Sequence, residues 1–150
     1  MRPLPETETE IHAFLAAFEA GTLPKEEFTH AAHILTGACY VHQLGKTAAI
    51  DHMRICIRHF NESVGGKNTD TSGYHETITI FWIKVLAALH GRNASLERAA
   101  FAALAVEAYK GRRDLFREFY DFDLVASTDA RREWLPPTRR RLNSHEIAEV

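Results

Sequence analysis

YHETITIFWIKVLAAL occupies residues 74–89, and it is apolar on nearly every side when it is wound as an α-helix. A helix that presents apolar side chains in all directions has to be surrounded by other elements, which places it at the centre of a bundle. The stretch follows a polar, glycine-containing loop and begins with Tyr74, His75 and Glu76. We therefore expect a central helix whose first turn carries side chains capable of chemistry.

The rest of the chain has helical spacing of its apolar residues, without an alternating strand pattern or an internal repeat. Further helices are expected at about 7–20, 30–44, 47–60, 95–109, 114–120 and 129–134. Thr29 and Ser95 are suited to cap helix starts, and Gly21, Gly45 and Gly91 to end helices. The predicted fold is all-α, a single compact bundle of about six or seven helices in residues 1–137, followed by a C-terminal tail, residues 138–150, that is free to be flexible.

Composition limits the functional classes. The chain has 150 residues, 45% of them hydrophobic, which is enough for one domain with a substantial core. A net charge of −2 argues against nucleic acid as a partner. We expect a cytoplasmic protein without a membrane partner, because no apolar run is long enough to cross a bilayer and the first residues do not resemble a signal peptide. Cys39 and Cys56 lie in apolar segments and are expected to be buried free thiols.

Two stretches carry side chains that can bind a metal. His30 and His33 are three residues apart, so they share one face of a predicted first helical turn. His75, at the start of the central helix, is the best candidate for a third ligand. Three histidines with an open position are typical of catalytic zinc, and histidine with a carboxylate also suits iron or manganese. The sequence predicts a divalent transition metal ion here without choosing among zinc, iron and manganese.

Three more residues complete the predicted site. Glu76 lies about 100° round the helix from His75, where it would act as a fourth ligand or as a general base. Tyr74 is a candidate proton donor in catalysis. Arg131 is expected to hold an anionic substrate through its guanidinium group. The polar loop at residues 61–73 is expected to close over the site as a lid.

These residues favour a small metal-dependent enzyme that activates water or oxygen or polarises a carbonyl group. Glu27-x-x-His30 also has the form of a di-iron motif, but such sites need a second copy, which the sequence lacks. The alternative is a metal-free helical domain that binds a small molecule or another protein, with histidines that form structural hydrogen bonds. The substrate and the oligomeric state are left open.

Three motifs together resemble a known family. They are Phe28-Thr29-His30-Ala31-Ala32-His33, then Tyr74-His75-Glu76-Thr77-Ile78-Thr79 with Trp82, and Ser127-x-x-Ala130-Arg131 with Trp134 and Pro136. In this combination the chain, from its first helix to Pro137, resembles a family of short, all-helical bacterial proteins that has no settled function. The resemblance implies a compact helical domain with these polar stretches as its signature, and it implies no reaction.

Overall fold

Caps and glycines set the limits of the first three helices. The side chain of Thr7 caps α1 (Glu8–Ala20) at the N–H of Glu10, and Gly21 ends this helix in the left-handed conformation. Thr29 caps α2 (His30–Leu44) by accepting from the N–H of Ala32. Gly45 ends α2, and α3 (Lys46–Ser63) begins directly after it. The limits predicted for α2 are confirmed.

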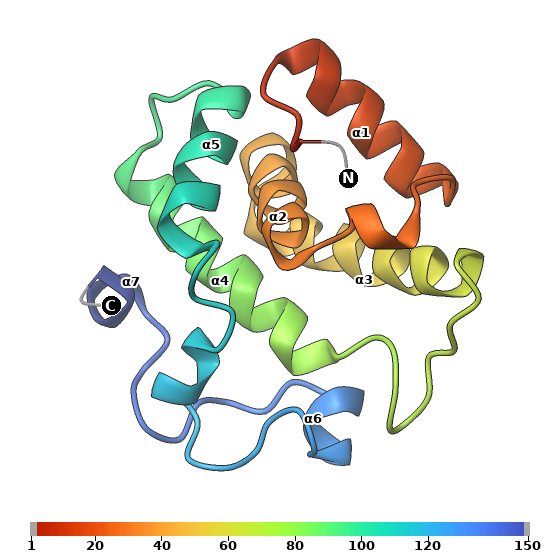
Figure 1. The fold of residues 1–150 in the computed structure, drawn as a ribbon. Helices are drawn as coiled ribbons and strands as arrows, with labels where there is room; N and C mark the ends of the chain where they lie inside the picture. The colour runs from red at the N-terminus through yellow and green to blue at the C-terminus, as the bar shows by residue number, and fades with distance from the viewer. Residues whose placement is uncertain (1–2, 149–150) are drawn as a thin grey trace.

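A computed structural model describes residues 3–148, and Figure 1 shows how its helices are arranged. Within that range the chain forms seven α-helices and two 3₁₀-helices and contains no strand, so the all-α prediction is confirmed. The remaining elements are η1 (Lys25–Glu27), α4 (Glu76–Arg92), α5 (Arg98–Tyr109), η2 (Leu115–Glu118), α6 (Thr128–Arg132) and α7 (Ser144–Ala148).

The centre of the bundle is formed by α2 and α4. In Figure 1, α2 is seen nearly end-on near the middle of the molecule, and it contacts α3, α4 and α5. α4 contacts α2, α3, α5, α6 and α7, as expected for a helix that is apolar nearly all round. The two central helices approach closely at Gly37, where a Cβ atom would lie 2.9 Å from Cδ1 of Leu86. The central helix predicted from residues 74–89 is confirmed.

Several predicted boundaries differ from the structure. α4 continues through Gly91 and ends at Asn93, whose backbone N–H bonds the carbonyl of His90 and whose side chain bonds that of Leu89. α5 therefore begins at Arg98 instead of Ser95. The helix predicted at residues 114–120 is the short 3₁₀-helix η2. The tail predicted after Pro137 includes α7, which contacts α4 and buries Ile147.

The loop between α3 and α4, residues 64–75, is fastened by Asn68. Its Oδ1 accepts hydrogen bonds from Nδ2 of Asn61 (3.1 Å) and from the N–H of Tyr74 (3.0 Å). Its Nδ2 donates to the carbonyl of Arg58. The loop is thereby tied to the end of α3 and to the start of α4, and its role as a lid stays a prediction.

We predict that Gly73→Ala destabilises the protein by about 2 to 4 kcal/mol, measured by urea denaturation. Gly73 has φ 77°, and a Cβ there would lie 2.5 Å from the carbonyl oxygen of Lys67. Gly65→Ala is the matched control, because Gly65 has φ 88° but no atom within 4 Å of the added Cβ. It should cost only the conformational penalty of about 1 kcal/mol. Equal losses in the two variants would contradict this account of the loop.

Candidate functional site

One cavity of about 480 Å³ gathers four of the residues that the sequence singles out: His30, His33, His75 and Arg131. It lies between α2, α3 and α4 and the chain segment at residues 113–131. Most of its wall is apolar, and the apolar lining residues include Phe28, Ile34, Met53, Ile57, Ile78, Trp82, Ile83, Leu86 and Phe116. The structure thus brings two distant sequence stretches, 28–37 and 73–86, to the same site.

His30 and His33 are each fixed by one backbone carbonyl. Nε2 of His30 lies 3.0 Å from the carbonyl oxygen of Tyr109, and Nδ1 of His33 lies 2.9 Å from that of Thr29. A carbonyl only accepts, so these two nitrogens carry the protons. Nδ1 of His30 and Nε2 of His33 are left as acceptors. Both acceptors are reachable by solvent, because the only fully buried and unpartnered side-chain N or O atom in residues 3–148 is Oγ1 of Thr36.

His75 differs from the other two histidines because both of its nitrogens are used. Its Nδ1 accepts from the N–H of Ile78 (3.1 Å), which caps α4. Its Nε2 donates to the carbonyl of Leu124 (2.8 Å), which joins the start of α4 to the segment before α6. An imidazole needs a free lone pair to bind a metal, and His75 has none in this arrangement.

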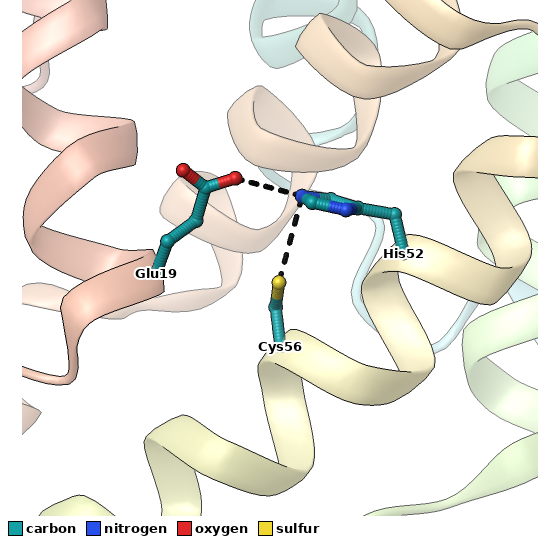
Figure 2. Close-up of side chains that lie close together, drawn as sticks. All are labelled: Glu19, His52 and Cys56. Atoms are coloured by element: carbon teal, nitrogen blue, oxygen red, sulfur yellow. Dashed lines mark hydrogen bonds and ion pairs between the residues drawn. The ribbon is translucent and has the colours of Figure 1, made fainter.

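The three histidines consequently do not form a ligand group. Within residues 3–148, one set of three His, Cys, Asp or Glu side chains has ligand atoms all within 4.8 Å of one another, and it consists of Glu19, His52 and Cys56. Figure 2 shows this set, in which Glu19 and Cys56 both approach Nε2 of His52. A group at metal-binding distance therefore exists, but it is not the predicted one.

Glu76 and Tyr74 lie outside the cavity lining. The Tyr74 hydroxyl donates to Oε1 of Glu76 (2.5 Å), and the guanidinium of Arg54 on α3 donates to both carboxylate oxygens. Burial raises the pKa of Glu76, but the hydrogen bonds from Arg54 and Tyr74 outweigh it and leave that pKa below its ordinary value. Burial and the bond to Glu76 raise the pKa of Tyr74. Through these contacts Tyr74 and Glu76 help to join α4 to α3. Glu76, the predicted base, and Tyr74, the predicted proton donor, do not line the cavity with the histidines.

Arg131 lines the same cavity as the histidines, and its role in holding a substrate stays a prediction. Its guanidinium donates to the carbonyls of Gly73 (2.8 Å) and Val125 (3.3 Å), and it has no ion pair among the described residues. Arg113, which the sequence did not single out, also lines the cavity, is exposed, and has no ion pair in the same range. The exposed Asp114 lies beside it and faces Arg117 at 3.8 Å.

The cavity histidines are neutral at pH 7. Burial lowers the pKa of His33 to about 4, and the hydrogen bond to Thr29 opposes that shift only in part. Burial also lowers the pKa of His30 and of His75. The site therefore offers uncharged imidazole acceptors, and its positive charge comes from arginine alone.

No single local pattern in the sequence brings Glu19, His52 and Cys56 together. His52 and Cys56 are four residues apart, so they share one face of α3, and this signal is visible in the sequence. Glu19 is brought to them by the packing of α1 on α3, which no local pattern reveals. Burial raises the pKa of Cys56 to about 11, so its sulfur is a thiol at neutral pH.

Comparisons with known proteins do not assign a family: no family model, curated protein or solved structure matches the chain. Within residues 3–148, no helix has both the length and the apolar character that crossing a membrane requires. The resemblance to a bacterial family stays a prediction, and function has to be argued from the cavity itself.

We predict that acid destabilises the protein partly through His33. In the unfolded chain His33 binds a proton near pH 6.5, whereas in the folded chain it does so only near pH 4. The unfolded state therefore binds more protons between these values, and the free energy of unfolding falls as the pH falls, by up to about 3 kcal/mol from this residue. Urea denaturation of wild type and His33→Gln at several pH values measures it.

The His33→Gln variant should lose part of this pH dependence, because glutamine does not titrate. His12→Gln is the control, since His12 is exposed on α1. If wild type and His33→Gln lost stability in parallel from pH 6.5 to 4, His33 would not be the neutral, half-buried group that its lowered pKa indicates.

Proposed function

We propose that the cavity binds a small organic anion with an apolar body, which is the metal-free alternative among the functions predicted from the sequence. The observation that carries the proposal is the combination of one largely apolar cavity with two arginines that lack carboxylate partners in residues 3–148. A volume of about 480 Å³ falls within the roughly 300 to 1,000 Å³ of small-molecule sites.

The apolar wall selects the body of the ligand. Side chains of α2, α3 and α4 line the cavity, and Phe28, Trp82 and Phe116 supply its aromatic surface. An apolar group that leaves water for such a wall gains about 25 cal/mol for each Å² that it buries. A hydrocarbon chain or an aromatic ring suits this wall better than a sugar or a nucleotide phosphate.

The charged rim selects the head group. Arg113 and Arg131 contribute two positive charges and Asp114 one negative charge, so the rim is positive by one. Arg131 is held in place by the carbonyls of Gly73 and Val125. A guanidinium that is fixed in this way is ready to bind a carboxylate without losing much side-chain freedom.

His33 and His30 provide the polar contacts inside. Nε2 of His33 and Nδ1 of His30 are free to accept a hydrogen bond from a ligand, because the other nitrogen of each ring carries the proton. They suit a ligand that has a hydroxyl or an amide N–H on its apolar body. His75 supports the wall and does not bind the ligand, since its two nitrogens are engaged.

Octanoate and octylamine, which have the same chain length and opposite charge, form a matched pair of probes. We predict that octanoate binds at one molecule per chain in isothermal titration calorimetry, while octylamine does not bind at the same concentration. Arg113→Gln should weaken octanoate binding by about two- to fivefold, because the group is exposed and screened. The free energy of unfolding of the Arg113→Gln variant should stay within about 0.5 kcal/mol of wild type.

Arg112→Gln is the control for this variant, because Arg112 is the adjacent arginine but does not line the cavity. It should bind octanoate as wild type does. Equal binding of octanoate and octylamine, binding of neither, or an Arg113→Gln variant that binds octanoate at full strength would refute the proposal.

The metal-dependent enzyme predicted from the sequence is the second candidate. What favours it is that His30, His33 and His75 line one cavity and that two of them retain a free nitrogen. It requires His75 to give up its bond to Leu124 or the cap of α4. Elemental analysis of wild type beside His30→Ala with His33→Ala tests it, and metal that disappears in the double variant would favour the enzyme over the anion-binding site.

A further inference from the structure

A second group of polar side chains lies apart from the cavity, between α1 and α3. Glu19 is the penultimate residue of α1, and His52 and Cys56 are one helical turn apart on α3. Figure 2 shows the three side chains converging from these two helices. None of the three lines the cavity described above.

The three candidate ligand atoms lie close together. Nε2 of His52 lies 2.8 Å from Oε1 of Glu19 and 3.5 Å from Sγ of Cys56. All three atoms lie within 4.8 Å of one another. Ligands at about 2.0 to 2.3 Å from a tetrahedral ion lie roughly 3.3 to 3.8 Å from one another, so a small separation of Glu19 from His52 would admit an ion.

Tyr40 on α2 orients the carboxylate. Its hydroxyl donates to Oε1 of Glu19 (3.0 Å), and its ring packs edge-on against the ring of His52, with centroids 4.3 Å apart. Tyr40 is itself buried. Hydrogen bonds of this kind, from a buried group to a ligating side chain, are a regular feature of metal sites.

The three side chains differ in solvent exposure, and this leaves the group open to an ion on one side. Cys56 is buried, His52 is half-buried and Glu19 is exposed, so the group opens to solvent on the side of Glu19. An ion could enter there and keep a water molecule as its fourth ligand. The sulfur of Cys56 lies on the inner side of the group.

We propose that Glu19, His52 and Cys56 bind a zinc ion. One sulfur, one nitrogen and one oxygen ligand form a set that zinc accepts, whereas magnesium and calcium prefer oxygen ligands alone. When the ion binds, the thiol of Cys56 releases its proton to solvent and the thiolate becomes a ligand. The proton with which Nε2 of His52 faces Glu19 is replaced by the ion, and the ring stays neutral by taking up a proton from solvent at Nδ1. With three protein ligands, the fourth position is open to water or to another small ligand.

Cobalt(II) titration tests the proposal, since cobalt replaces zinc in such sites and a thiolate ligand gives it a characteristic ultraviolet charge-transfer absorption. We predict one equivalent of bound cobalt with this absorption, displacement by one equivalent of zinc, and no displacement by magnesium. Cys56→Ala should abolish the thiolate absorption. Cys39→Ala should retain it, because Cys39 is buried elsewhere in the core.

Glu19→Gln provides a variant that does not endanger folding, because Glu19 is exposed. It removes the charge of one ligand and should weaken zinc binding by about tenfold or more. Thiolate absorption that is absent in the wild type, or that persists in Cys56→Ala, would overturn the assignment. So would unchanged zinc affinity in Glu19→Gln. Octanoate binding is a separate readout, so failure here leaves the anion proposal to its own test.

Discussion

His75 links the start of the central helix to the C-terminal part of the chain, and this constraint decides what the neighbouring cavity can do. One ring nitrogen caps α4 at Ile78 and the other donates to the carbonyl of Leu124. The cap positions the first turn of α4 and the residues just before it. One of these is Gly73, whose carbonyl accepts a hydrogen bond from Arg131. While both of its nitrogens are engaged in this way, His75 has no lone pair for an ion. The cavity is therefore left with neutral acceptors on α2 and with two arginines, and the anion binding that we propose rests on these arginines.

The fold was predictable where local signals are strong. Thr29 and Gly45 mark the two ends of α2, and the apolar run at residues 74–89 marks a helix that has to be surrounded. Prediction failed where tertiary contacts override the local pattern. Gly91 does not end α4, because Asn93 supplies the terminating hydrogen bonds two residues later. The burial of Ile147 depends on the approach of α7 to α4, which the polar tail sequence does not reveal.

The sequence pointed to residues that the structure brings to one cavity, but it did not reveal their hydrogen bonds. The spacing of His30 and His33 and the position of His75 at a helix start grouped three residues that line one cavity. Which ring nitrogen stays free is decided by hydrogen bonds to the backbone carbonyls of Tyr109, Thr29 and Leu124. The spacing of side chains in the sequence does not reveal these bonds. Glu76 was expected beside the histidines, but Arg54 of α3 holds it in a separate ion pair.

The most direct test of this account is the protonation state of each cavity histidine, read from proton–nitrogen correlation spectra of protein with isotope-labelled histidine at pH 7. The account predicts three neutral rings, with the proton on Nε2 in His30 and His75 and on Nδ1 in His33. It also predicts that none of the three changes when zinc is added. Concerted zinc-dependent changes at His30, His33 and His75 would show that these residues assemble into a metal site and would contradict the anion-binding account.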